Sequence, residues 1–203
     1  MFVPLESCSG SFRLRDAVPT NESTRTARVG VRDDYVNTGR VLDMPTCERA
    51  SVIPADFETV WRFYDGVDGL RRLTPAWMGA RVRRVAGPDG QRDPEEYLVG
   101  TEIQLEIRPF NSTSLPAIEW VVEITDRVVG ADRAYFVDEQ VGDRGPFERW
   151  RHVHAFVDLG HRTLLYDRVT YRVPYVGSLP LATPGIAVLL WHRHRRTRAL
   201  LAE

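Results

Sequence analysis

Two histidines and two aspartates are the residues of this chain best suited to chemistry. His152 and His154 are separated by one residue, so both imidazoles share one face if residues 146–174 form two antiparallel strands joined by a turn. Asp167 falls in the second of these strands, and Asp138 falls in the segment before them. A buried carboxylate needs a partner, and an imidazole beside it can act as a general base. These residues therefore predict a His–Asp pair.

Three interpretations of this pair stay open. The spacing of His152 and His154 can chelate a metal ion if Asp138 or Asp167 supplies a further ligand. Alternatively, the imidazoles hydrogen-bond carboxylates within the sheet as a structural network, or they contact the polar end of a ligand. No other histidine is expected to join them, because the others fall in a turn or near the chain end: His161, His192 and His194. We favour the last two interpretations and expect no metal and no cofactor.

The strands that carry these groups mix large apolar side chains with a few polar ones. On the first strand, the shared face carries Trp150, His152, His154 and Phe156. On the second strand, it carries Leu165, Asp167, Val169, Tyr171 and Val173. An apolar wall with a few placed polar groups is typical of a ligand cavity.

The same alternation extends the predicted cavity wall to neighbouring strands. Asp138 and Gln140 share a face with Phe136, and Trp120 lies on an alternating strand further upstream. The predicted ligand-contacting residues are Trp120, Phe136, Gln140, Trp150, His152, His154, Phe156, Asp167 and Tyr171. The candidates for a catalytic role are His152, His154, Asp138 and Asp167. A shift of one residue in strand register would turn each of these side chains to the opposite face.

The order of elements along the chain predicts an α+β fold. A first strand at 47–53 precedes two short helices, which are followed by about six antiparallel strands and one long helix. The predicted strands are 80–85, 96–109, 117–128, 133–141 and the two in 146–174, and the last helix is 181–202. A curved antiparallel sheet must cover its concave face, and the last helix is the long element left to do so.

Length and composition indicate one globular domain with an appendage. The chain has 203 residues, 43% of them hydrophobic, and a formal net charge of −1. This charge provides no field that would attract nucleic acid. No apolar run reaches the length of a membrane-spanning helix, and the start lacks a signal-peptide pattern, so we expect a cytoplasmic protein without stable membrane insertion.

Residues 1–43 show no persistent helical or strand periodicity. They are rich in polar residues, which predicts a disordered or loosely attached tail ahead of a ligand-binding domain at 44–203. Two alternatives stay open: Met44 is the true start of the protein, or the segment is a regulatory arm. The oligomeric state is not specified by the sequence.

Three segments resemble the START-like or SRPBCC superfamily, which includes the pollen allergen Bet v 1 and polyketide cyclases and dehydrases. They are PADFETVWRFYDGVDGLRRLTP (54–75), FVDEQVGDRGPFERWRHVHAF (136–156) and TLLYDRVTYRVP (163–174). The likeness spans about residues 46–202. The three segments look like those of a prokaryotic branch of ligand-binding proteins. It implies a helix-grip fold, in which a curved sheet wraps around a long C-terminal helix. A fold shared by carriers, receptors and cyclases does not specify the function.

Three functions are compatible with these features. The first is a module that binds a hydrophobic small molecule, such as a lipid, a quinone or a polyketide-like compound, between the sheet and the last helix. The second is an enzyme of the cyclase or dehydratase type that uses a His–Asp pair as acid and base. The third is an interaction protein whose cavity is filled by its own aromatic side chains. We favour the first and expect a small-molecule partner and no nucleic acid.

Overall fold

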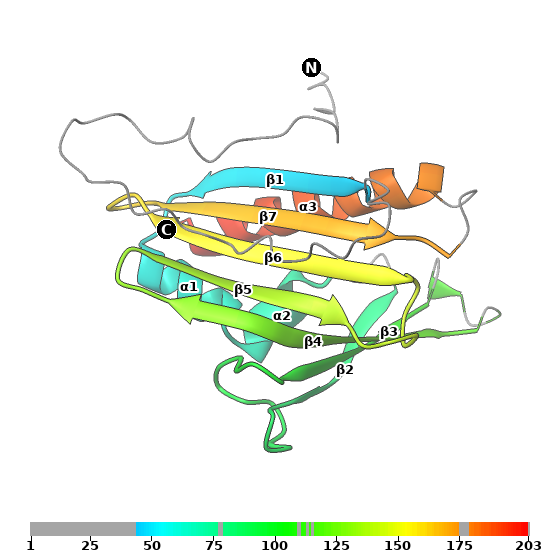
Figure 1. The fold of residues 1–203 in the computed structure, drawn as a ribbon. Helices are drawn as coiled ribbons and strands as arrows, with labels where there is room; N and C mark the ends of the chain where they lie inside the picture. Colours follow the sequence, from blue (N-terminus) through cyan, green and yellow to red (C-terminus); the bar gives the residue numbers. More distant parts are fainter. Residues whose placement is uncertain are drawn as a thin grey trace, which may run out of the picture.

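A curved antiparallel sheet and three helices make up the part of the chain that the computed structural model describes, which is residues 44–76, 79–108, 111–112, 114, 116–174 and 179–202 (Figure 1). The strands are β1 (Thr46–Ile53), β2 (Ala80–Ala86), β3 (Glu102–Ile107), β4 (Ile118–Val129), β5 (Arg133–Gln140), β6 (Arg149–Asp158) and β7 (Thr163–Arg172). The helices are α1 (Phe57–Tyr64), α2 (Val67–Leu73) and α3 (Leu179–Leu201). The predicted tail, residues 1–43, lies outside the described residues.

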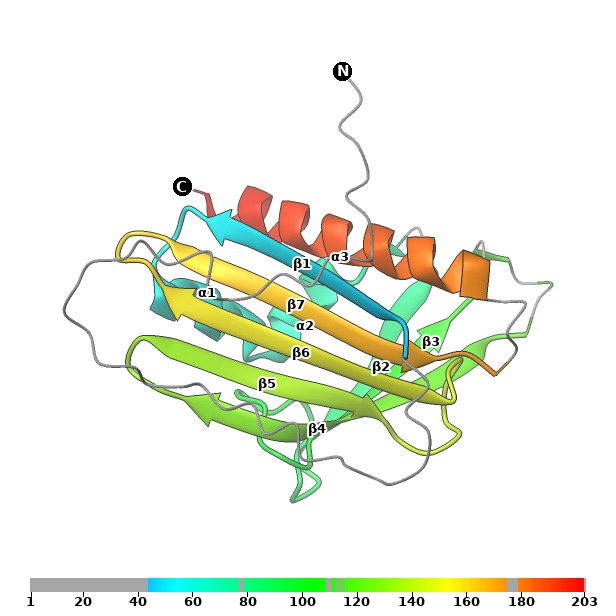
Figure 2. The ribbon, with the colours of Figure 1, turned by 45° about the horizontal axis from the view of Figure 1, so that its top comes forward.

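The strands form one sheet in the order β1-β7-β6-β5-β4-β3-β2, with every neighbouring pair antiparallel. The first strand thus pairs with the last, and all connections between the other neighbours are hairpin-like. Figure 2 shows the three helices on the same side of this sheet. Helix α3 packs against β1 and β7, and α2 packs against α3 and β2. The predicted helix-grip architecture is therefore confirmed.

Local sequence explains why β6 and β7 form a hairpin. Gly160 adopts a φ of +84°, a left-handed conformation that glycine adopts without a steric penalty. The Asp158 carboxylate accepts a hydrogen bond from the Gly160 backbone N–H at 2.8 Å. Alternation along both strands then buries the predicted faces, including Trp150, Phe156 and Leu165.

Helix α1 supplies an apolar face to the sheet. Val60, Trp61 and Tyr64 lie on one side of the helix and are buried. The ring of Trp61 meets that of Phe156 edge-on, with 5.4 Å between the ring centroids. This contact places α1 over the C-terminal half of β6.

One predicted strand is longer than the observed one. The sequence pattern predicts a strand over 96–109, but β3 begins at Glu102. The chain turns before it, because Gly100 has a φ of +91° and the Thr101 N–H donates to the Leu98 carbonyl at 3.0 Å. Residues 96–101 therefore form a loop, and the buried Tyr97 belongs to this loop. Among the described residues, no helix is long and apolar enough to cross a membrane.

Candidate functional site

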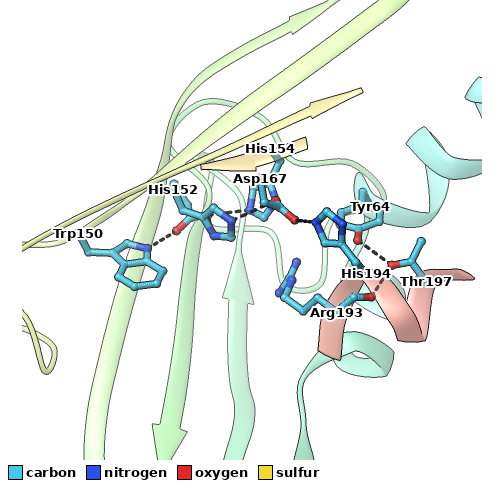
Figure 3. A network of polar contacts seen from close by, with 9 residues as sticks. Tyr64, Trp150, His152, His154, Asp167, Arg193, His194 and Thr197 are labelled. Atoms are coloured by element: carbon cyan, nitrogen blue, oxygen red, sulfur yellow. Dashed lines mark hydrogen bonds and ion pairs between the residues drawn. The ribbon is translucent and has the colours of Figure 1, made fainter. Parts of the chain in front are cut away.

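A buried carboxylate, Asp167, lies at the centre of the polar network inside the fold (Figure 3). Its Oδ1 accepts a hydrogen bond from His152 Nε2 at 3.1 Å and lies 2.6 Å from His154 Nδ1. Its Oδ2 lies 2.7 Å from His194 Nε2, on helix α3. Two imidazoles from β6 and one from the gripped helix α3 thus converge on one carboxylate of β7.

A second carboxylate, Asp138 of β5, lies on the other side of the two strand histidines. Its Oδ1 accepts a hydrogen bond from the Trp150 indole at 2.9 Å. Its Oδ2 lies 3.1 Å from His154 Nε2 and 3.6 Å from His152 Nδ1. The register explains this arrangement, because Asp138 is paired with His152 across β5 and β6, and His154 with Asp167 across β6 and β7. The predicted His–Asp pairing is therefore present twice.

Helix α3 contributes polar groups that the sequence interpretation did not include. The expectation that no further histidine joins the group is wrong, because His194 bonds Asp167 and also lies 2.9 Å from Ser51 Oγ through its Nδ1. The Tyr64 hydroxyl lies 2.7 Å from Thr197 Oγ1, which ties α1 to α3. Leu190, His194 and Thr197 follow helical spacing and are all buried. That spacing was the available signal for His194.

Burial and pairing act in opposite directions on the acidity of this network. Burial alone raises the pKa of Asp167, but the charge of His154 and the hydrogen bonds from the three histidines hold it well below its usual range. The pKa of Asp138 is lowered for the same reasons, through His154 and His152 against burial. Both aspartates are therefore ionised in the folded protein.

The two strand histidines differ from one another in acidity. Burial and the neighbouring charge of His154 lower the pKa of His152, so its imidazole is neutral. The pKa of His154 is raised despite burial, because Asp167 and Asp138 both stabilise its protonated form. The network thus contains two carboxylates, a neutral imidazole and a charged one side by side, with the two rings 3.7 Å apart.

A cavity of about 90 Å³ adjoins this network between the sheet, α2 and α3. Asp138, His152 and His154 line one part of it, and the rest is almost entirely apolar. The lining residues from α1, α2, the segment after α2, and α3 are Tyr64, Leu70, Leu73, Thr74, Pro75, Leu189 and Arg193. Those from the sheet and the loop before β3 are Ala80, Tyr97, Ile103, Leu105, Ile107, Trp120, Val122, Phe136 and Trp150.

Five of the nine predicted ligand-contacting residues line this cavity: Trp120, Phe136, Trp150, His152 and His154. The other four lie elsewhere in the fold. Phe156 packs edge-on against Tyr64 with 5.0 Å between ring centroids, and Asp167 lies behind the two histidines. The Tyr171 hydroxyl contacts the Thr183 hydroxyl of α3, and the Gln140 amide bonds the backbone of Phe147.

Among the described residues, four side chains that line the cavity have a buried polar atom without a hydrogen-bond partner. One is His154, whose Nδ1 lies 2.6 Å from Asp167 Oδ1 as an ion-pair contact, and the other three have no such carboxylate beside the atom. They are the Tyr97 hydroxyl, the Trp120 Nε1 and the Arg193 Nε. Tyr97 is 2% exposed and Trp120 is 8% exposed. Buried polar groups are nearly always hydrogen-bonded, and leaving one unpaired costs about 1–3 kcal/mol. Only Trp120 of these three was among the predicted residues.

Local contacts hold these donors against the cavity. The Tyr97 backbone N–H donates to Asp65 Oδ1 at 3.2 Å, and Asp65 is in turn bound by Arg127 at 2.6 Å. The Trp120 ring meets the Trp150 ring edge-on, with 4.8 Å between centroids. These contacts fix the loop before β3 and one wall of the cavity.

The arrangement of strands and helices is that of a known fold. A curved sheet that grips a C-terminal helix, with two short helices after the first strand, is the helix-grip fold of the START-like and Bet v 1-like proteins, as predicted. No family model matches this chain, and no curated protein matches it.

Several solved structures are similar to the chain. A protein from Arthrobacter aurescens superposes with a TM-score of 0.55 at 15% identity, over 77% of this chain and 86% of that one. Ara h 8.0201 gives 0.52 at 13% identity, over 77% and 97%. A truncated norcoclaurine synthase from Thalictrum flavum gives 0.51 at 16% identity, over 78% and 94%. At these identities the similarity shows the fold alone.

Proposed function

We propose that this protein binds a small molecule with an apolar body and a hydrogen-bond acceptor in the cavity between the sheet, α2 and α3. The observation that carries the proposal is the set of three unpaired donors in an apolar wall, Tyr97, Trp120 and Arg193. An indole N–H and a guanidinium N–H can only donate. Burial raises the pKa of the Tyr97 hydroxyl, which keeps it protonated as a donor. A carbonyl or carboxylate on the ligand would accept hydrogen bonds from such donors.

This donor set narrows the class of ligand. An alkyl chain alone would leave the three donors unpaired, whereas a quinone, an aryl ketone or a polyketide-like compound carries acceptors on a flat body. The walls suit such a body, because the aromatic residues Trp120, Phe136 and Trp150 line the cavity. Aromatic compounds that bear a carbonyl group therefore fit this cavity better than simple lipids do.

The volume of the cavity limits the size of the ligand. Drug-sized ligands occupy pockets of about 300–1,000 Å³, and an apolar cavity of about 150 Å³ admits benzene. At about 90 Å³ the cavity is smaller than either. A ligand of one or two rings would therefore bind together with movement of wall side chains. Because some space remains, the aromatic side chains do not fill the interior completely, which disfavours a purely structural core.

A matched pair of compounds tests the proposal. Acetophenone and ethylbenzene have nearly the same shape, and only acetophenone carries a carbonyl acceptor. Isothermal titration calorimetry is expected to show tighter binding of acetophenone, although ethylbenzene is the more hydrophobic compound. One net hydrogen bond is worth about 0.5–1.5 kcal/mol, so the expected preference is about 2- to 13-fold.

A variant identifies the donor. Tyr97→Phe is expected to weaken acetophenone binding by about 2- to 13-fold, through the loss of one hydrogen bond, and to leave ethylbenzene unchanged. Tyr135→Phe is the matched control, because this hydroxyl bonds Asp126 and does not line the cavity. Equal binding of the two compounds, or an unchanged acetophenone affinity in Tyr97→Phe, would contradict the proposal.

Acid–base catalysis is the second candidate function. Asp138 and His154 line the same cavity, one ionised and the other with a raised pKa, so the wall holds a base and an acid side by side. The norcoclaurine synthase with the same fold shows that this architecture can support an enzyme. Turnover of a polyketide-like substrate that is lost in His154→Gln, with binding retained, would favour this function over simple binding.

A further inference from the structure

We propose that Asp138, His152 and His154 form a binding site for a divalent first-row transition-metal ion such as Zn²⁺, Co²⁺ or Fe²⁺. Two imidazoles and one carboxylate are a common ligand set for these ions. This site is distinct from the three donors proposed above, and ion binding does not depend on the organic ligand. It departs from the expectation, drawn from the sequence, that no metal is bound.

The spacing of the candidate ligand atoms fits a common ion. One ligand atom from each of the three residues lies within 4.8 Å of the others. Asp138 Oδ2 lies 3.1 Å from His154 Nε2 and 3.6 Å from His152 Nδ1. Two atoms bound about 2.1 Å from an ion, at angles of 90–110°, are separated by about 3.0–3.4 Å. Small side-chain shifts would therefore complete the coordination.

The opposite nitrogens of both imidazoles lie beside Asp167, which accepts a hydrogen bond from that of His152 and forms an ion-pair contact with that of His154. His152 Nε2 and His154 Nδ1 lie 3.1 Å and 2.6 Å from its Oδ1. Metal-binding histidines almost always donate their second N–H to such a carboxylate, which fixes the ring orientation and the tautomer. His194 holds the remaining oxygen of Asp167 at 2.7 Å. The orienting shell of a metal site is thus present around the two histidines.

Asp138 is positioned in a comparable way. The Trp150 indole donates to its Oδ1 at 2.9 Å and leaves Oδ2 directed to the two imidazoles (Figure 3 shows Trp150 at one end of the network). If His152 is neutral and donates to Asp167, its Nδ1 lone pair faces this oxygen. Two lone pairs in contact repel one another, and a cation between them removes the repulsion.

Charge balance also supports a divalent ion. Asp138 and Asp167 are 8% and 0% exposed, and burial of uncompensated carboxylates is costly. When an ion is bound, both imidazoles are neutral ligands, so the two carboxylates carry a charge of −2 and one divalent ion neutralises it. All three candidate ligands line the cavity, so further coordination positions would face it. Three protein ligands with open positions are typical of catalytic rather than structural metal sites.

Metal titration of the whole protein tests this inference. After treatment with a chelator and its removal, the protein is titrated with Co²⁺, followed by its visible absorption bands, and then with Zn²⁺ as competitor. We expect one ion per chain. Asp138→Asn and His154→Gln are expected to abolish this 1:1 binding, whereas His192→Gln and His161→Gln, which alter other histidines, leave it unchanged.

A separate variant tests the residues that orient the two histidine ligands from behind. His194→Gln is expected to keep the 1:1 stoichiometry and to weaken the affinity by about 10- to 100-fold, because it removes a contact behind the ligands. Circular dichroism verifies that each variant is folded. If a ligand variant does not fold, X-ray absorption of the Zn²⁺ complex of the unaltered protein replaces it and is expected to show two imidazole ligands.

Several results would overturn the inference. They are the absence of binding to the folded protein, 1:1 binding that persists in folded Asp138→Asn and His154→Gln, and a zinc spectrum with fewer than two imidazoles. None of these bears on the proposed ligand site. Acetophenone binding is measured with chelator present, so the two proposals fail or succeed separately.

Discussion

Replacement of Asp167 by asparagine tests the role of the buried network most sharply. Asp167 is fully buried and faces three imidazoles at 2.6–3.1 Å. Asparagine preserves the shape but removes the charge, and one of its oxygens becomes an amide donor. The protonated His154 then loses its nearest counter-charge inside the protein. Breaking a buried ion pair by removing one partner costs about 3–5 kcal/mol.

The assay is urea unfolding of the metal-free protein with chelator present, followed by tryptophan fluorescence. We expect the free energy of unfolding to fall by about 3–5 kcal/mol. In thermal unfolding, the same change lowers the melting temperature by about 6–20 °C, at about 2–4 °C per kcal/mol for a chain of this size. Asp132→Asn is the matched control, because its carboxylate pairs with Arg133 on the surface at 2.9 Å. Such a pair contributes about 0–1 kcal/mol. If Asp167→Asn lowers the free energy of unfolding by no more than Asp132→Asn does, the assigned role of the network is refuted.

Three further predictions rest on particular contacts. Tyr64→Phe removes the 2.7 Å hydrogen bond to Thr197 and is expected to cost about 1 kcal/mol in urea unfolding. Gly69→Ala would place a Cβ 1.6 Å from a backbone oxygen of α1 and is expected to destabilise the fold strongly. Gly185→Ala is its control, because the added Cβ meets no atom within 4 Å, and it is expected to stabilise α3 by about 0.5–1 kcal/mol. Equal effects of the two substitutions on stability would contradict the packing of α2 on α1. Leu105→Ala is expected to widen the cavity and to tighten binding of ketones larger than acetophenone, as measured by calorimetry. Unchanged size selectivity would place the ligand elsewhere.

The sequence predicted the strands of the site well, because their signal is local. Period-two alternation placed His152 and His154 on one face of their strand and Asp167 on the apolar face of the next, and these side chains are buried in the structure. The pairing of histidine with aspartate also followed, since a buried carboxylate needs a partner. The helix-grip order could be read from two short helices after one strand and a long helix at the end.

Contacts between elements that are distant in the sequence could not be predicted from local patterns. Helical spacing can place His194 on a buried face, but only the docking of α3 against β1 and β7 brings it to Asp167 and Ser51. Tyr97 was missed because its segment alternates like a strand, whereas Gly100 turns the chain before β3. The two cavity donors from this loop and from α3, Tyr97 and Arg193, therefore depended on tertiary structure.

The side-chain resonance of Trp120 tests the proposed function most directly. In protein labelled with ¹⁵N-tryptophan, the indole N–H signals report hydrogen bonding at each ring. Acetophenone is expected to shift the Trp120 signal downfield, because its unpaired N–H gains an acceptor, and to leave that of the exposed Trp191 unchanged. Ethylbenzene is expected to produce no such downfield shift. An unmoved Trp120 signal under saturating acetophenone, or the same shift with ethylbenzene, would contradict a ligand held through its acceptor in this cavity.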